Sequence, residues 1–384
     1  MIQTGVKKIR HTFSELLRDS RSVGILLTLC TLASLLLANS PFRDLYLRVW
    51  NADTHFTDAL HLPHSPLHWI NDGLMAVFFF LAGLEIKREL LEGELKEVRR
   101  ALLPIFAAVG GMIVPAVLYR LFNVGGAFDH GWGIPMATDI AFSLGIASLL
   151  GKRVPLSLKI FLTALAIIDD LGAIVIIALF YGSSLQLDML AGAAVTTIGI
   201  VLLARKQAPL LIRLVLGMVL WYFLFNSGIH ATVAGVILAF TVPIREVGDL
   251  EHGLHIPVNF IILPVFALAN TAIPIQAGLM ETLQHPINYG IMAGLVIGKP
   301  LGIVLFSYLL IQLKWGKLPA SVSWKQMSGI GMLAGIGFTM SIFIATLAFT
   351  DVYAQDLAKV SILLASLLSV VLGSITLALA SRKP

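Results

Sequence analysis

The stretch SLKIFLTALAIIDDLGAIVIIALFY, Ser157–Tyr181, is an apolar run long enough to cross a bilayer, and two adjacent acids, Asp169 and Asp170, lie at its middle. A charged side chain at the centre of a membrane helix costs roughly 2.5–3.5 kcal/mol on the most lenient insertion scale. Acids at that depth normally bind an ion, carry a proton or neutralise another buried charge. Two other apolar runs hold a third acid, Asp139, and a base, Lys299. These four groups form the candidate functional site.

The composition assigns the chain to the membrane proteins. Apolar residues make up 57% of the 384 residues and charged residues only 13%, whereas a soluble domain carries about 25% charged residues. Long apolar runs predict helices, because a β-barrel alternates polar and apolar residues over short segments. We therefore expect an all-α polytopic membrane protein with about twelve transmembrane helices. The expected spans are 23–39, 67–86, 101–122, 132–150, 155–181, 189–204, 209–225, 228–243, 256–273, 287–312, 327–349 and 357–381.

The basic residues support this number of spans. When the connections are numbered alternately from an N-terminus placed inside, 22 of the 27 Lys and Arg residues fall in inside connections. The positive-inside rule then predicts that both termini are cytoplasmic. The net charge of +5 belongs to these loops, so no nucleic-acid partner is expected.

The domain organisation predicted from these patterns is simple. Residues 1–22 form a cytoplasmic segment, within which residues 6–19 place an apolar stripe opposite a basic face, a pattern typical of a helix lying on the membrane surface. Residues 23–381 form a single transmembrane domain, and residues 382–384 are a cytoplasmic C-terminus. Cys30 is the only cysteine, so no disulfide within the chain is possible.

Two expected spans contain residues that break helices. The span 132–150 carries Gly133 and Pro135 just before Thr138 and Asp139, and the span 327–349 has four glycines in its first half. Pro removes a backbone donor and repeated Gly weakens a helix. Unwound backbone at membrane depth persists only inside protein or beside water, and each new helix end carries about half a unit charge.

The positions of these two spans suggest an internal repeat. One follows the third span and the other follows the tenth, and with twelve spans they cross the membrane in opposite directions. Two interrupted, crossing helices in corresponding triplets are typical of inverted repeats with a binding site at the membrane midplane. The alternative is that the glycines only permit close helix packing, as the motifs Gly294-x-x-x-Gly298 and Gly331-x-x-x-Gly335 suggest. Both interpretations can hold together.

The charged groups lie at similar depth. Counted at 1.5 Å per residue from the ends of their spans, Asp139, Asp169 and Lys299 all fall near mid-bilayer. One acid can pair with Lys299, so at least one other is left to bind protons or a hard cation, for which oxygen ligands are suited. Thr138 can add an oxygen. The alternative is that the charges only offset helix dipoles. We keep this as part of the role of Asp139 and Lys299, and we disfavour it for Asp169 and Asp170.

At these residues the chain resembles the NhaA family of sodium/proton antiporters, and the resemblance covers nearly the whole chain. The matching stretches are WINDGLMAVFFFLAGLEIKREL (69–90), GGMIVPA (110–116), ATDIAFSLG (137–145), RVPLSLKIFLTALAIIDDLGAIVIIALFY (153–181), SGIHATVAGVI (227–237), LEHGLH (250–255), IGKPLGI (297–303) and GIGFTMSIFIATLAF (335–349).

The resemblance implies specific roles. Asp169 and Asp170 are expected to bind Na⁺ or Li⁺ and protons, with Asp170 the stronger candidate for direct ion contact. Asp139 and Lys299 are expected to compensate the crossed, unwound chains, and Lys299 to pair with Asp169 when no ion is bound. Members of the family exchange external protons for cytoplasmic Na⁺ or Li⁺ across the bacterial inner membrane, many of them activated at alkaline pH, and a homodimer is expected. Two adjacent acids favour electrogenic exchange, with two protons for each cation.

The resemblance also points to a pH response at the inner ends of two spans. Its candidates are Glu85, Arg88, Glu89, Glu251, His252 and His255. The alternative is that these are ordinary solvated charges at loop ends. The chain departs from the family pattern at Gly248 and Asp249, where two basic residues are expected before Leu-Glu-His, and this affects the pH set-point. His230 is expected to be a packed, hydrogen-bonded histidine and not a proton carrier.

The outer connection 40–66 raises two further questions. It contains His55, His61 and His64, but their spacing matches no known zinc finger and disfavours a metal site. The alternation of Leu45, Leu47 and Val49 predicts a short strand, which the resemblance places at a dimer contact.

Three other functions compete with antiport. A sodium-coupled symporter of an organic solute, the main alternative, has similar broken helices but needs a second, larger pocket. An intramembrane aspartyl protease also uses two acids, but adjacent residues project about 100° apart on a helix and face each other poorly. A channel does not need acids that must be emptied in each cycle. We therefore expect a transporter and not an enzyme, without a cofactor.

Overall fold

The computed structural model describes residues 20–54, 60–182, 184–274 and 284–381, and within these ranges all regular structure is helical. The predicted all-α class is therefore confirmed. The segment predicted at 1–22 lies outside the described residues except for its last three, as do His55 and the C-terminal residues 382–384. The helices are α2 Ser20–Ala38, α3 Arg43–Asn51, α4 Pro66–His68, η2 Trp69–Leu74, α5 Met75–Leu91, α6 Val98–Asn123, η3 Asp129–Met136, α7 Ile140–Leu149, η4 Gly151–Arg153, α8 Leu156–Phe180, α9 Leu187–Arg205, α10 Leu210–Phe225, α11 Val233–Thr241, α12 Ile244–Pro257, η5 Val258–Ile262, α13 Leu263–Asn270, α15 Pro286–Met292, η6 Ala293–Gly298, α16 Lys299–Gln312, α17 Trp324–Ala334, α18 Phe338–Ala348 and α19 Val352–Ala380.

Each of the twelve predicted spans contains a helix. In the described ranges nine helical stretches are long and apolar enough to cross a membrane, and a tenth is the bent pair α17 and α18. The helices α10 and α11 are shorter, with 16 and 9 residues. The span predicted at 228–243 was too long, because the chain turns over 226–232 before α11 begins. Gly228 takes a φ of +88° within this turn, a left-handed conformation that suits glycine.

The short strand predicted around Leu45, Leu47 and Val49 was wrong. These residues lie on the helix α3. Helical spacing brings the rings of Tyr46 and Trp50 together edge-to-face, with centroids 5.8 Å apart. The Tyr46 hydroxyl lies 3.0 Å from the Leu268 carbonyl oxygen. These two contacts fix the helical register of the segment, and the alternation of apolar residues is incidental.

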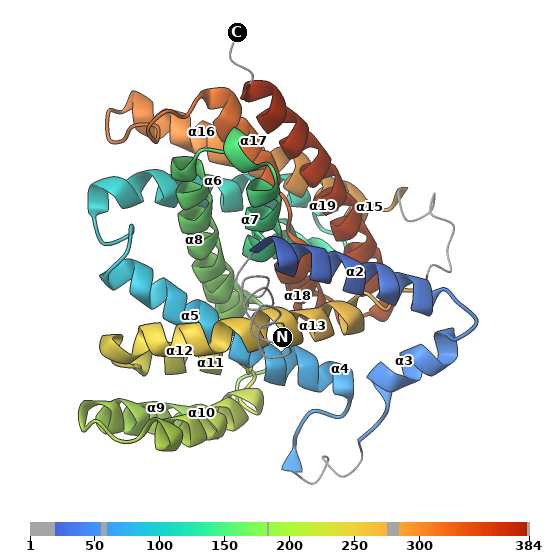
Figure 1. Ribbon diagram of the computed structural model, residues 1–384. Coiled ribbons are helices and arrows are strands. Elements are labelled where there is room, and N and C mark those ends of the chain that lie inside the picture. The colour runs from blue at the N-terminus through green and yellow to red at the C-terminus, as the bar shows by residue number, and fades with distance from the viewer. Residues whose placement is uncertain (1–19, 55–59, 183, 275–283, 382–384) are drawn as a thin grey trace, which may run out of the picture.

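The helix α8 lies between two groups of helices (Figure 1). On one side are α6, α16, α17 and α19, and on the other are α5, α11 and α12, with the pair α9 and α10 beyond them. Glycines allow the closest approach between α6 and α16. A Cβ atom added to Gly110 would lie 2.3 Å from the Gly302 carbonyl oxygen, and one added to Gly302 would lie 2.1 Å from the Gly110 carbonyl oxygen. The backbones of the third and tenth spans are therefore in direct contact.

Two prolines widen the helices in which they lie. Pro264 and Pro300 lack the N–H that would bond to the carbonyl four residues earlier. Just before each of them the helix opens into a π turn, η5 before Pro264 and η6 before Pro300. Such turns often occur at functional sites. The second one leads directly into Lys299.

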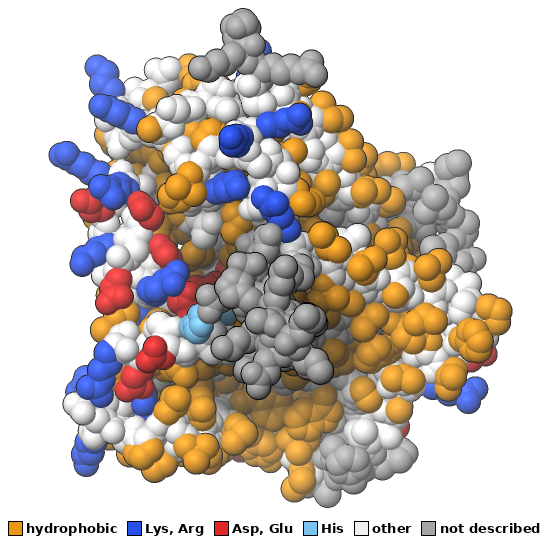
Figure 2. Space-filling view, viewed as in Figure 1, with side chains coloured by type: hydrophobic (Ala, Val, Ile, Leu, Met, Phe, Trp, Pro, Cys, Tyr) orange, Lys and Arg blue, Asp and Glu red, His pale blue; other side chains and the backbone are white. Residues whose placement is uncertain are grey.

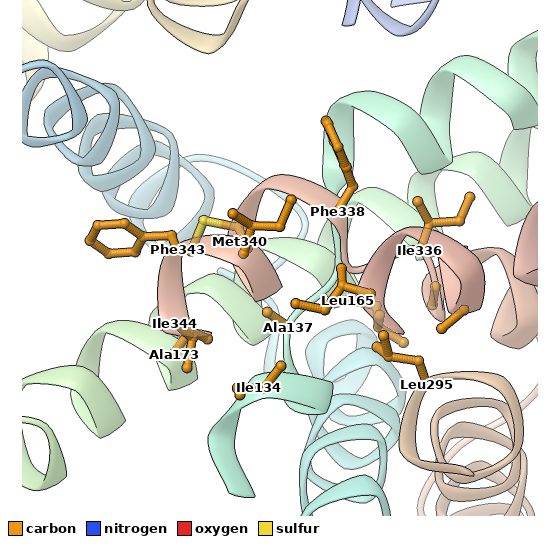
Figure 3. Close-up of a cluster of buried hydrophobic side chains, with 14 of the residues drawn as sticks. Ile134, Ala137, Leu165, Ala173, Leu295, Ile336, Phe338, Met340, Phe343 and Ile344 are labelled. Carbon is orange, nitrogen blue, oxygen red and sulfur yellow. The ribbon is translucent and has the colours of Figure 1, made fainter. Parts of the chain in front are cut away.

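The two broken spans meet in the interior. The fourth span is interrupted at 137–139, between η3 and α7, and the eleventh at 335–337, between α17 and α18, which bend by 46°. The Asp139 N–H donates to the Ile336 carbonyl at 2.7 Å, which joins the two breaks through the backbone. Figure 3 shows Ala137 and Ile336, one from each break, beside Leu165 of α8. The predicted pair of interrupted, crossing helices is confirmed, and apolar side chains surround the crossing.

The surface is divided between apolar and charged regions (Figure 2). In this view, apolar side chains cover most of the side formed by α2, while Lys, Arg, Asp and Glu side chains gather on the opposite side, over the ends of α5 and α12. On α2, for example, Leu29 and Leu36 are 58% and 72% exposed. Large exposed apolar surface is what a lipid-facing helix presents.

Candidate functional site

Lys299 and Asp169 form a fully buried ion pair beside the crossing of the broken spans. The Lys299 Nζ atom lies 2.6 Å from Asp169 Oδ2, and both side chains are 0% exposed. The π turn η6 precedes Lys299 at the start of α16, and Asp169 lies mid-way along α8. The pairing predicted from the sequence is therefore present. In a buried site the attraction between such charges must offset the loss of their hydration, so the pair depends on further hydrogen bonds.

Those further bonds come from the broken fourth span. Lys299 Nζ also donates to the carbonyl of Met136, the last residue of η3. A positive charge is favourable there because a helix C-terminus carries partial negative charge. The Thr138 hydroxyl lies 2.7 Å from Asp169 Oδ2 and 2.9 Å from the carbonyl of Ala334, the last residue of α17. A hydroxyl has one proton, so Thr138 serves one of these acceptors at a time.

Asp139 accepts hydrogen bonds at the start of α7 and at the start of α18, the helices that follow the two breaks. Its Oδ1 accepts from the Phe142 N–H at 2.9 Å, at the start of α7. Its Oδ2 accepts from the Thr339 N–H at 3.0 Å and from the Thr339 hydroxyl at 2.5 Å, in the first turn of α18. Helix N-termini attract negative charge. One carboxylate thus offsets the dipoles of two helices.

Asp170 lies in a different environment from its neighbour. It is 3% exposed, and among the described residues it has neither a hydrogen bond nor an ion pair; its Oδ1 is buried without a partner. Consecutive residues on a helix point about 100° apart, which is why Asp169 meets Lys299 while Asp170 does not. Asp170 instead lines a cavity. Asp169 Oδ1 is also buried without a partner, so each acid keeps at least one oxygen unoccupied within the described residues.

The cavity leads from Asp170 toward one end of the bundle and has a volume of about 190 Å³. We call this end the Arg88 end, and the opposite one, where α8 finishes, the Tyr181 end. Apolar side chains form most of the wall. The polar residues on it are Glu85, Arg88, Thr138, Asp139, Thr163, Asp170, His255, Asn259 and Thr339. The cavity therefore connects Asp170 with the Arg88 end and has carboxylates at both ends, while Asp169 is not among its lining residues.

Most of the residues proposed for a pH response gather at the Arg88 end. Arg88 lies 2.7 Å from the Glu251 carboxylate and 3.2 Å from that of Glu89, which ties α5 to α12. Glu85, Arg88 and His255 line the cavity itself. His252 is exposed on α12 and is not among the lining residues.

At the Tyr181 end, hydrogen bonds join the end of α8 to the broken fourth span. The Tyr181 hydroxyl accepts from the Gly133 N–H at 3.0 Å and donates to the His130 carbonyl at 2.8 Å. His230 Nε2 lies 2.7 Å from the Tyr181 carbonyl oxygen, and since a carbonyl only accepts, this nitrogen carries the proton. The prediction that His230 is packed and hydrogen-bonded is confirmed.

Sequence reasoning missed three polar residues of the cavity wall. Thr339 follows the glycine break of the eleventh span, as Thr138 and Asp139 mark the break of the fourth, and this correspondence was a usable signal. Thr163 lies two turns before Asp170 on α8, and Asn259 is an isolated amide in an apolar run. Neither is charged, so neither stands out by its cost in a membrane.

Comparison with known proteins agrees with the resemblance. The family model described as Na+/H+ antiporter 1 matches residues 14–377. A Flavobacterium johnsoniae protein named Na(+)/H(+) antiporter NhaA 1 is 48% identical over 377 residues, covering 96% of this chain and 97% of that protein. Proteins named Na(+)/H(+) antiporter NhaA from Shewanella putrefaciens and Cytophaga hutchinsonii are 50% and 46% identical, over 96% and 98% of this chain and 96% and 97% of their own lengths.

Proposed function

The chain belongs to the sodium/proton antiporter family and exchanges Na⁺ for H⁺ as a multi-pass membrane protein, and we propose that Asp169 and Asp170 are the groups that bind both ions. The observation that carries this proposal is Asp170, a buried carboxylate without a protein partner that faces a cavity. A hard cation prefers oxygen ligands. The unoccupied oxygens of Asp169 and Asp170 provide them, and Thr138 adds a third.

Competition at these oxygens accounts for exchange. A carboxylate that holds Na⁺ does not hold a proton, so the two ions occupy the site in turn. Lys299 takes part because it pairs with Asp169 when no cation is bound. A cation that binds both acids takes the place of the ammonium group beside Asp169.

The number of groups that can hold a proton favours two protons for each cation. Asp169, Asp170 and Lys299 lie together, and a cation bound between two ionised acids can displace a proton from two of these three groups. If Asp170 carries one proton, and Asp169 or Lys299 carries the other, each cycle moves one net charge across the membrane. Exchange is then electrogenic and responds to the membrane potential.

The two ends of the bundle suggest which state the structure represents. The cavity reaches Asp170 from the Arg88 end, while Tyr181 holds η3 at the other. We assign the Arg88 end to the cytoplasm of a bacterial inner membrane, since the excess of Lys and Arg in the connections at that end follows the positive-inside rule. In this assignment the structure is open inward, and rocking of the broken spans exposes the acids to the other side.

A pH response fits the contacts at the Arg88 end. The bridge from Arg88 to Glu251 joins α5 to α12, and His255 lies on the cavity wall close by. Protonation changes in this group alter the packing of the two helices at the mouth of the cavity. Li⁺ as a second substrate and a homodimer in the bilayer belong to the same proposal.

A symporter of an organic solute is less compatible with the cavity. Sites for drug-sized molecules are typically about 300–1,000 Å³ with several convergent polar groups. This cavity has about 190 Å³, which is below that range. No residue is assigned a catalytic role, and no cofactor is required for ion exchange.

The test uses everted membrane vesicles that carry a ΔpH-sensitive dye. Addition of Na⁺ or Li⁺ is expected to dissipate the proton gradient, whereas K⁺ is expected to have no effect. A gradient that collapses only when an organic solute accompanies Na⁺ would support the symporter instead.

A further inference from the structure

We propose that Thr163, Asn259 and Glu85 form a second, weaker cation site on the cavity wall, between the Arg88 end and Asp170. The three side chains come from α8, η5 and α5 and line the same cavity. The inference rests on the proposed function, because it describes how Na⁺ reaches the acid pair. We call these three residues the entry site.

Each residue of the entry site lies on the cavity-lining face of its helix, next to apolar lining residues. On α8 the lining residues are Thr163, Ile167 and Asp170, spaced four and three apart as on one helical face. Thr163 lies seven residues before Asp170, about 10 Å nearer the Arg88 end at 1.5 Å per residue. In the ninth span Asn259 lies between His255 and Leu263 on the lining face. A route that only holds water does not require an oxygen-bearing side chain at these positions. A face that only packs against other helices would carry apolar side chains there.

The oxygens of the entry site are available to a ligand. Within the described residues, neither the Glu85 carboxylate nor the Asn259 amide has a hydrogen bond or an ion pair. The Thr163 hydroxyl donates its proton to the Lys159 carbonyl at 3.1 Å, so its oxygen remains an acceptor. One carboxylate, one amide oxygen and one hydroxyl oxygen are ligands for a hard cation and not for an anion.

Charge favours a cation at this place. Arg88 is bonded to both Glu89 and Glu251 and also lies near Glu85, so three carboxylates share one positive charge at this place. A cleft with an excess of one sign of charge concentrates ions of the other sign. Glu85 also lies close enough to Asp170 for their charges to interact, so a cation held at Glu85 is drawn on toward the acid pair. A single carboxylate binds less tightly than two, which suits a site that must release its ion inward.

Two substitutions with opposite expected effects test the entry site in intact membranes. Thr163→Val keeps the shape and removes the oxygen, and we expect it to raise the Na⁺ concentration for half-maximal exchange by about fivefold with the maximal rate unchanged. Asn259→Asp adds a carboxylate and is expected to lower that concentration. Thr163→Ser restores the oxygen and the original value.

The matched control is Thr196→Val. Thr196 also donates to the carbonyl four residues earlier, Gly192 at 2.8 Å, but it lies on α9 and does not line the cavity. Its substitution is expected to leave the half-maximal Na⁺ concentration unchanged. A purely structural role for Thr163 predicts a loss of protein or of maximal rate in Thr163→Val, without the shift in Na⁺ dependence.

The result that overturns the entry site is an unchanged half-maximal Na⁺ concentration in both Thr163→Val and Asn259→Asp while the wild-type protein exchanges normally. If Thr163→Val does not accumulate, Asn259→Asp alone decides, since only a cation contact predicts tighter Na⁺ dependence. A different result would overturn the proposed role of Asp169 and Asp170, namely normal exchange by the Asp170→Asn variant.

Discussion

Thr339 makes two hydrogen bonds to one oxygen of Asp139, through its backbone N–H at 3.0 Å and its hydroxyl at 2.5 Å. The two residues belong to different broken spans, and the same carboxylate also receives the Phe142 N–H of α7. The start of α18 is therefore fixed to the start of α7 through a single side chain. A carboxylate that caps two helices in this way holds the two unwound segments in register. Its loss is expected to destabilise the starts of both α7 and α18.

Asp139→Ala is expected to destabilise the protein more than removal of an ordinary helix cap. Loss of a cap costs about 1–2 kcal/mol for each helix end, and here two ends lose their acceptor. The control is Asp351→Ala, which removes the cap of α19 alone, where Asp351 accepts from the Ala354 N–H at 3.1 Å. Thermal unfolding in detergent measures both. Equal losses of melting temperature would contradict a shared cap.

Asp169→Asn and Asp170→Asn are each expected to abolish Na⁺-dependent proton movement while the protein still inserts. Each substitution removes a charge that the cation needs and a group that the proton needs. Dye dequenching in everted vesicles gives the activity, and the amount of protein in the membrane gives insertion. Asp188→Asn, at an exposed acid on α9, is the control and should exchange normally. Near-normal exchange by Asp170→Asn would rule out the proposed site.

Lys299→Ala is expected to lower the stability by roughly 3–5 kcal/mol, the usual cost of leaving a buried charge without its partner. Lys152→Ala, at an exposed lysine, controls for the loss of a positive charge elsewhere. The double variant with Asp169→Asn and Lys299→Ala should recover part of the loss, because it also removes the unpaired carboxylate. The measurement is the melting temperature in detergent, and no recovery in the double variant would argue against a dependence on the pair.

Exchange is expected to be electrogenic. With two protons for each cation, an inside-negative potential should speed Na⁺ efflux from sealed liposomes whose cytoplasmic face is inward. The potential contributes about 2.3 kcal/mol per 100 mV for each net charge moved. A potassium gradient with valinomycin sets the voltage. If the rate of Na⁺ efflux does not change with the membrane potential at any pH where transport is active, exchange is one-for-one and electrically neutral.

The sequence predicted those parts of the site that are costly in a membrane. Asp139, Asp169 and Lys299 stand out in apolar runs whatever their neighbours are, and the breaks near Pro135 and Gly335 can be located from single residues. The division of roles between Asp169 and Asp170 depends on which helices face α8 on each side. That information lies in the packing of segments far apart in the chain.

The errors came from patterns that fit two structures. The spacing of Leu45, Leu47 and Val49 agrees with a strand, but Leu45 and Val49 are also four residues apart, as on one face of a helix. Similarly, the apolar run 228–243 is long enough in composition to suggest a span, while the left-handed turn at Gly228 is visible only in the backbone. Thr163 and Asn259 were missed because a neutral polar residue in a span is common.

The contact between Gly110 and Gly302 limits which parts of the protein can act as the moving parts. Its closest atoms belong to the two backbones, and the Phe306 ring packs against Gly110, so this close-packed contact leaves little room for a second arrangement. Such a contact holds α6 and α16 at a fixed position relative to each other. We therefore expect the difference between the two access states to arise away from this contact, above all at the hydrogen-bonded breaks, where a few bonds can be exchanged without repacking a core.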